Sequence, residues 1–200
     1  MHRDESSIET PISGDDTLGT LIGNTLRTAL FVTMIAVLAH ILLPYPFLPS
    51  TVVSLQSVGV FLAGVLLGPI WGTAAAILVL IAGAVGLPVL HGGTGMEFLF
   101  SSPKSGYFLS YPLAAVAIGY IVHRGPGLRD FQTVSAKVLT GAVIVGLATT
   151  NIMLTVVYVI IMDTGVVEAL LITTPQFIPL EILKLGAVIV IIRTDLVAAV

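Results

Sequence analysis

Two ionisable residues stand close together in an otherwise apolar stretch, Glu181 and Lys184 in FIPLEILKLG. Their three-residue spacing places both side chains on one face of a helix. A charged group inside a membrane span costs about 2.5 to 3.5 kcal/mol on insertion scales, so each is a candidate functional residue. One interpretation is a mutually neutralising ion pair that packs the helix. The other is an acceptor and a cation that face a cavity and bind a ligand.

A glycine-rich stretch, LHGGTGMEFLFSSPKSG from 90 to 106, offers a second set of candidates. Its glycines let the backbone approach a ligand and expose N–H groups that bind polar atoms. The alternative is an ordinary external turn. Lys104 is either solvated or attracts an anionic substrate. The glycines concerned are Gly92, Gly93, Gly95 and Gly106.

The other polar residues have more ordinary interpretations. His91 suits an interfacial or hydrogen-bonded histidine, and no second ligand stands at a metal-site spacing from it, so we expect no metal site. Gln56 is typical of a hydrogen bond between helices, although it lies near the external end of its helix and remains a candidate. Tyr107, Tyr111 and Trp71 suit anchors at the membrane interface.

The sequence lacks the motifs of several common nucleotide-binding and catalytic sites. The chain has no GxxxxGK[ST], HExxH or GxSxG pattern and no cysteine, so we expect a binding protein without catalytic residues or a bound cofactor. It also has no basic run that would attract nucleic acid.

The composition places the chain in a lipid bilayer. Of its 200 residues, 56% are hydrophobic and 10% charged, against roughly 25% charged in soluble domains. No Asp, Glu, Lys or Arg occurs from Thr28 to Met96. Five of the eleven acids fall within the first sixteen residues, so residues 1–20 are expected to be a solvated tail and 21–200 one transmembrane domain.

Apolar stretches between proline and glycine breaks predict an all-α bundle of six transmembrane helices. Each must pair its backbone internally, and roughly 20 residues cross a bilayer core about 30 Å thick. The expected spans are 21–43, 52–67, 70–90, 107–122, 138–162 and 177–192, with a PYPFLP turn at 44–49 and a polar connection at 123–132.

The distribution of basic residues predicts that both termini are cytoplasmic. This orientation leaves only Lys104 outside, with Lys184 inside a span, and it also makes the 90–106 stretch and the loop around Asp163 and Glu168 external. The basic residues on the cytoplasmic side are Arg3, Arg27, Arg124, Arg129, Lys137 and Arg193.

The order and spacing of these stretches resemble the BioY family, the biotin-binding S components of energy-coupling-factor transporters. The stretches are PYPFLPSTVVSLQSVGVFLAGVLLGP, GAVGLPVLHGGTG and SPKSGYFLSYPLAA, followed by PQFIPLEILKLGAVIVIIR, where the family usually has Pro-x-Asp-x-x-Lys. The resemblance implies a protein of the cell membrane that captures biotin outside and works with a T component and two cytoplasmic ATPases.

The resemblance also implies roles for individual residues. Glu181 takes the place of the family's acid and suits the ureido N–H groups of biotin. Lys184 takes the place of its lysine and meets either the ureido oxygen or the carboxylate, for which Lys104 is the rival. The glycine-rich and Gly-Tyr elements correspond to Gly92, Gly93, Gly106 and Tyr107, and we add His91 and Gln56 as binding candidates.

A stripe of small residues, Thr25, Ala29 and Thr33, falls where S components meet the T component. The family commonly has Ala where this chain has Thr33. It also commonly has Pro-Thr-Gly-Gly-Tyr where this chain has Pro-Lys-Ser-Gly-Tyr at 103–107, and a second double glycine at 95–96, and its acid is one methylene shorter.

Two alternatives to biotin uptake remain open at this point. One is an S component for another water-soluble vitamin, such as thiamine or riboflavin. The other is a membrane enzyme or a helical scaffold without transport activity.

Overall fold

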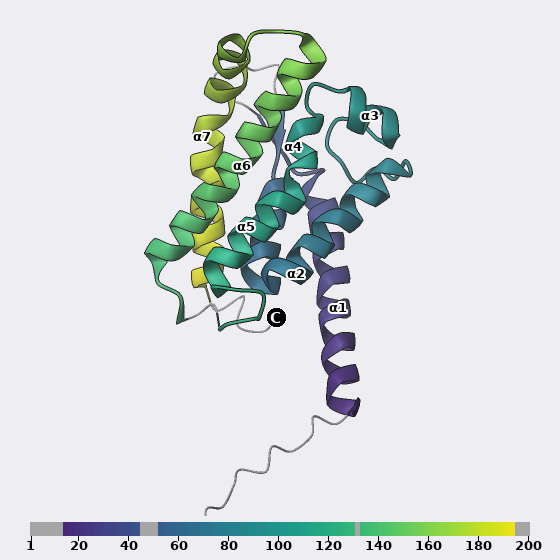
Figure 1. Ribbon diagram of the computed structural model, residues 1–200, viewed down its shortest axis with the longest axis vertical. Helices are drawn as coiled ribbons and strands as arrows, with labels where there is room; N and C mark the ends of the chain where they lie inside the picture. The colour runs from purple at the N-terminus through teal and green to yellow at the C-terminus, as the bar shows by residue number, and fades with distance from the viewer. Residues whose placement is uncertain (1–13, 45–51, 131–132, 195–200) are drawn as a thin grey trace, which may run out of the picture.

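The computed structural model describes residues 14–44, 52–130 and 133–194, and it is a helical bundle (Figure 1). The backbone outside two short strands is mostly helical, as expected where water cannot pair N–H and C=O groups. The helices are α1 (Gly14–Leu38), α2 (Gln56–Ala84), α3 (Gly95–Ser101), α4 (Ser105–Leu109), α5 (Tyr111–His123), α6 (Ala136–Met162) and α7 (Val166–Arg193), and the strands are β1 (Leu42–Pro44) and β2 (Val52–Ser54).

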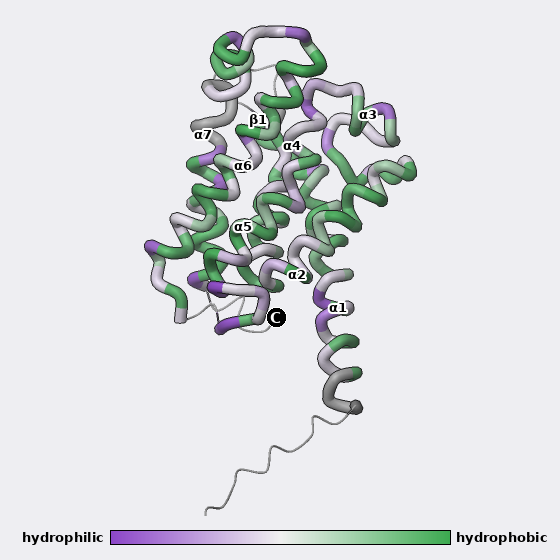
Figure 2. The backbone as a smooth tube through the Cα atoms, viewed as in Figure 1, coloured by the Kyte–Doolittle hydropathy of each residue, from purple (hydrophilic) through white to green (hydrophobic). Residues whose placement is uncertain are grey.

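Four stretches in the described part are long and apolar enough to cross a membrane. Figure 2 shows that hydrophobic residues dominate the helices and that hydrophilic ones gather at their ends and in the connections. The chain is therefore a helical, multi-pass membrane bundle. The four stretches are Leu18–Leu38, Gln56–Ala84, Ser105–His123 and Ala136–Met162.

The long helix α2 is broken at Gly68, where φ is 76° and ψ is −175°, a conformation that favours glycine. A Cβ on Gly72 would lie 2.6 Å from the carbonyl oxygen of Ala63. A straight helix would hold these residues about 13 Å apart, so the chain folds back at the break. The expected boundary at Gly68-Pro69 is thus a sharp bend between two helical halves.

Glycines let α5 approach both halves of α2. A Cβ on Gly64 would lie 2.8 Å from the carbonyl oxygen of Ala115, and one on Gly119 would meet the backbone of Pro69. Small residues at such contacts let helix backbones come close in a membrane. The core therefore lies where α5 crosses the bend of α2.

His123 completes this crossing. Its Nε2 lies 2.8 Å from the carbonyl oxygen of Val65, which in an unbroken helix would accept from residue 69. That residue is Pro69 and has no N–H, so the imidazole supplies the missing donor. The Nδ1 atom accepts the N–H of Arg129 at 2.9 Å, which fixes the proton on Nε2.

The first helix and its connection differ from the expectation. Helix α1 begins at Gly14, inside the stretch expected to be a tail, and ends at Leu38 rather than Leu43. Residues 42–44 instead pair antiparallel with 52–54, Leu43 opposite Val53. The β-branched Val52 and Val53 and the N–H-free Pro44 favour extended backbone, so the second helix begins at Gln56. Of the expected turn at 44–49, only Pro44 lies within the described residues.

The later boundaries also differ in part. Helix α2 ends at Ala84, earlier than the expected 90. The 90–106 stretch, expected to be a loop, contains α3 and the start of α4. Helix α7 begins at Val166, so Glu168 lies in its first turn and not in a loop. The expected start at 177 was wrong because the backbone stays helical past prolines 175 and 179.

Candidate functional site

The spacing of Glu181 and Lys184 left two interpretations open, and the ion pair of the first one is present on α7. Lys184 Nζ lies 3.1 Å from Glu181 Oε1. The ammonium also donates to the hydroxyl of Tyr107 at 2.9 Å, and that hydroxyl is 3.4 Å from Glu181 Oε1. These three side chains, here called the polar triad, join α4 to α7.

The polar triad is enclosed by the bundle. Lys184 is 1% exposed and Glu181 is 5% exposed, so each charge depends on the other for compensation. Glu181 Oε2 makes no hydrogen bond to any described residue. A buried carboxylate oxygen without a donor is costly, so the triad offers a ligand a strong acceptor position.

Further hydroxyl groups surround the triad. Ser57, at the start of α2, and Tyr111 on α5 are fully buried and close enough to interact electrostatically with it. Within the described part of the chain, the Tyr111 hydroxyl makes no hydrogen bond. A ligand placed here would meet a carboxylate oxygen and a hydroxyl group that still lack partners.

An aromatic cluster forms the apolar side of this site. The Tyr107 and Tyr111 rings meet edge to face, with centroids 5.6 Å apart, and Phe108 lies 5.8 Å from Tyr111. Phe98 of α3 extends the cluster, 5.6 Å from Phe108. Lys184 Nζ is 5.4 Å from the centroid of Tyr107. Edge-to-face contacts and the cation fix the ring orientations and leave apolar faces beside the charges.

Tyr111 and Ser57 were not expected at the site. We interpreted Tyr111 as an interface anchor, but it is 0% exposed and lies in the core. Its position four residues after Tyr107 places both on one helical face, which is the signal that could have identified it. Ser57 is brought close to the polar triad by tertiary packing alone. The sole sequence signal for it was a polar residue within an apolar span.

The expected glycines have different environments. Gly92 has a φ of 94° and open space around it, which suits an exposed backbone turn. Gly93 lies against the ring of Phe98. A Cβ on Gly106 would meet the backbone of Met153, so this glycine lets α4 pack closely on α6. Its direct structural effect is to position Tyr107.

The other expected binding residues have environments of their own. Gln56 is fully buried, donates from Nε2 to the carbonyl oxygen of Val89 at 2.7 Å, and has no described partner for Oε1. His91 is half-buried. Lys104 is exposed and borders a cavity of about 200 Å³, mainly between α6 and α7. That cavity is lined by Ser102, Pro103, Lys104, Leu154, Tyr158, Ile172 and Thr173.

The small-residue stripe lies on the outer face of α1. Thr25, Ala29 and Thr33 are exposed, whereas Phe31 and Ile35 face the core. The threonine hydroxyls donate to the helix itself, to Leu21 O at 2.8 Å and to Ala29 O at 3.1 Å. This face is consequently apolar and open to lipid or to another helix.

Comparisons with known proteins agree on one family. A model of the BioY family matches residues 11–199. The biotin transporter BioY of Rhizobium etli is 41% identical over 100 residues, 48% of this chain and 52% of that protein. The one from Rhodobacter capsulatus is 38% identical over 99 residues, 46% of this chain and 52% of that protein. The chain spans about half the length of the curated relatives it matches.

Solved structures show the same fold. An S component for biotin from an ECF-type ABC transporter superposes with a TM-score of 0.74 at 23% identity, covering 92% of this chain and 93% of that one. An S component of a bacterial ECF transporter gives 0.51 at 18% identity, with 86% and 91% covered. The bundle is therefore built like these S components.

Proposed function

The chain belongs to the BioY family, and from that premise we propose that it is the substrate-binding subunit of a biotin uptake system. It is a multi-pass protein of the cell membrane. The curated relatives are named biotin transporters, and the structure with the higher similarity is described as the S component for biotin. The observation that carries the proposal is the buried Glu181, held by Lys184 while its Oε2 has no described partner.

The chemistry of biotin matches this arrangement. Its ureido ring has two N–H donors and one carbonyl acceptor, and its valerate chain ends in a carboxylate. Glu181 Oε2 accepts a ureido N–H, and Lys184 donates either to the ureido oxygen or to the carboxylate. The aromatic cluster provides an apolar surface for the sulfur-containing ring and the alkyl chain. Lys104 remains the rival for the carboxylate.

Other residues complete the proposed pocket. Gly92 and Gly93, in the segment after α2, supply backbone N–H groups, and the half-buried His91 beside them supplies a polar contact. Gln56, at the start of α2, supplies its Oε1, which has no partner among the described residues. Gly106 acts by placing Tyr107. These assignments rest on the family resemblance together with the polar groups described above.

In this proposal the bundle crosses the membrane six times, with both termini in the cytoplasm. The fold-back at Gly68 supports two crossings by α2, and the 28 residues of α7 suffice for a sixth. The subunit works with a T component and two cytoplasmic ATPases. The exposed apolar face of α1 around Thr25, Ala29 and Thr33 supports docking of the T component there.

Equilibrium binding of radiolabelled biotin to the purified chain tests the proposal. Glu181→Gln keeps the side-chain size and an oxygen for Lys184 but replaces the carboxylate, so we expect saturable binding in the parent and at least tenfold weaker binding in the variant. Glu168→Gln is the matched control, because it makes the same change at an exposed position of the same helix. Equal affinity of the two variants would contradict the assignment of Glu181.

The segment at 103–107 departs from the family pattern, so the transported ligand could be a vitamin other than biotin, and this alternative can be tested directly. Ser105 stands where the family has Gly, and its hydroxyl donates to the Ser102 carbonyl at 2.7 Å inside the protein. An S component for another vitamin would retain that vitamin on purification. Mass spectrometry of the ligand released from the purified chain distinguishes thiamine or riboflavin from biotin.

A further inference from the structure

A second cavity lies at the opposite end of α5 from the polar triad. It has a volume of about 160 Å³ and is lined by residues from the end of α5, the following connection and the start of α6. A water molecule occupies about 30 Å³ in the liquid, so several polar atoms fit. The lining residues are Val122, Arg124, Arg129, Thr133, Val134, Ser135 and Val138.

The cavity wall is held in place by specific contacts. His123 accepts the N–H of Arg129, and Arg124 caps α5 in the left-handed region at φ 56°. Arg193, at the end of α7, donates to the carbonyl oxygen of Val134 at 3.0 Å. The backbone positions of the two arginines that line the cavity, Arg124 and Arg129, are therefore fixed by these contacts.

The cavity has the chemistry of an anion site. Within the described part of the chain, the guanidinium groups of Arg124 and Arg129 make no ion pair, and Asp130 is not among the lining residues. Ser135 accepts the Val138 N–H at 3.4 Å, which leaves its own proton free to donate. The first N–H groups of α6 have no partner within the helix, and its positive end lies here. Arginine suits phosphate oxygens because it can donate to two of them at once.

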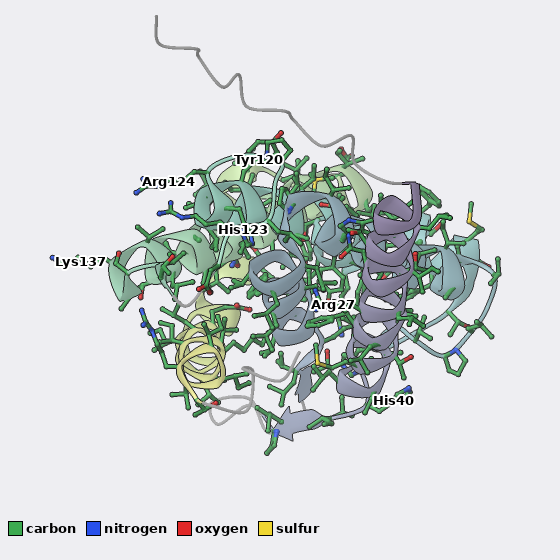
Figure 3. All side chains as sticks on the ribbon, turned by 90° about the horizontal axis from the view of Figure 1, so that it is seen from below. Arg27, His40, Tyr120, His123, Arg124 and Lys137 are labelled. Carbon is green, nitrogen blue, oxygen red and sulfur yellow. The ribbon has the colours of Figure 1, made fainter. Side chains whose placement is uncertain are left out.

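The position of the cavity indicates which anion it meets. Two candidate spans, Ser105–His123 and Ala136–Met162, end and begin at its edge, so it lies at the level of the lipid headgroups. Tyr120 is half-exposed one turn before Arg124, as at a membrane interface. Figure 3, a view onto this end, shows Arg124 and Lys137 pointing outward while His123 lies inside.

The lining also matches both parts of a lipid. Val122, Val134 and Val138 line the same space as the arginines, and the partly exposed Val138 offers apolar contact to glycerol or the first acyl carbons. A soluble phosphate would gain nothing from these valines. Basic pockets between membrane helices are known sites for anionic lipid headgroups.

We propose that this cavity, built on Arg124, Arg129, Ser135 and the start of α6, binds the phosphate of an anionic phospholipid such as phosphatidylglycerol. The lipid bridges α5 and α6 at their shared end. This site is separate from the polar triad and does not depend on the identity of the transported ligand.

Binding of fluorescently labelled phosphatidylglycerol to the full chain in neutral detergent tests the proposal. A basic residue near an anionic membrane surface contributes about fivefold to affinity, so Arg124→Gln with Arg129→Gln should weaken binding roughly 30-fold. Lys137→Gln is the control, because it removes a charge at the same end that does not line the cavity. We expect this control to change affinity fivefold at most.

Competition on the parent chain identifies the source of the phosphate and needs no variant. Unlabelled phosphatidylglycerol should displace the probe, and phosphatidylcholine should require at least tenfold higher concentration. If inorganic phosphate or glycerol phosphate displaced the probe at the same concentration as unlabelled phosphatidylglycerol, the assignment to a lipid would be overturned. Equal displacement by the two lipids, or equal loss in the double variant and Lys137→Gln, would overturn the site.

Discussion

The two cationic regions of this bundle compensate their charges in opposite ways. Lys184 is 1% exposed and contacts both Glu181 and Tyr107, whereas Arg124 and Arg129 are exposed and have no ion pair within the described residues. An enclosed charge must bring its counter-ion from the protein, while a charge at the surface can take it from outside. The buried region therefore selects its ligand through the one carboxylate oxygen of Glu181 that has no described partner. The exposed region instead takes its counter-ion from outside the protein, in the form of the anion that it binds.

The largest effect is expected from removing the buried cation. Lys184→Met leaves the Glu181 charge uncompensated and should destabilise the fold by about 3 to 5 kcal/mol, seen as a lower midpoint of thermal unfolding in detergent. Changing both residues together, Glu181→Leu with Lys184→Met, should recover most of that stability while ligand binding stays lost. A double variant as unstable as the single one would show that the pair is needed for folding.

His123→Ala should have the next largest effect, about 2 to 3 kcal/mol. The change leaves the buried Val65 carbonyl and the part-buried Arg129 N–H without their partners. His40→Ala is the matched control, since that ring also bonds a carbonyl oxygen, at Pro88, but is exposed. Thermal unfolding of both variants measures the difference. Equal losses of stability would contradict the inference that the hydrogen bond of His123 to the bend in α2 is worth more than an exposed one.

Gly106→Ala should cost about 1 to 3 kcal/mol, because the added Cβ meets the Met153 backbone and pushes α4 away from α6. Tyr107 moves with α4, so ligand affinity should fall as well. Gly141→Ala on α6 has open space and should be neutral or up to about 1 kcal/mol stabilising. Unfolding midpoints report the loss of packing between α4 and α6, and biotin binding reports the displacement of Tyr107. A Gly106→Ala variant with the stability of the parent would contradict the close packing of α4 on α6.

The smallest effect on stability is expected at the exposed cations. Arg129→Gln should change the unfolding free energy by less than about 0.5 kcal/mol in neutral detergent, since an exposed side chain without an ion pair contributes little. The same variant should lose part of the extra stability that added phosphatidylglycerol gives the parent. If the variant is as strongly stabilised by the lipid as the parent, the contrast between the two regions fails.

Sequence reasoning found the residues whose signal is local. Glu181 and Lys184 were expected on one helical face because a three-residue spacing fixes helical neighbours, and the structure brings them to 3.1 Å. The apolar composition was enough to predict a helical membrane bundle. The number of crossings stays a prediction, since α2 contains two helical halves joined at Gly68.

Sequence reasoning failed where tertiary contacts decide. The sixth span was expected to begin at 177, just after the proline at 175, yet the backbone of α7 is helical from Val166. The strand pair at 42–44 and 52–54 depends on two segments meeting across a connection, which no single window shows. Ser57 reaches the polar triad only because α2 packs against the other helices, so its position along the chain relative to Glu181 carried no signal.

The bend in α2 also constrains the order in which the chain can be assembled. Val65 and Pro69 are synthesised and delivered to the membrane well before His123, whose ring is the donor that Val65 receives. Until α5 arrives, the bend must hold an unsatisfied carbonyl, which hydrocarbon does not tolerate. Residues 56–84 are therefore expected to remain in contact with the insertion machinery or with water and to enter the lipid together with α5, as a single unit of integration.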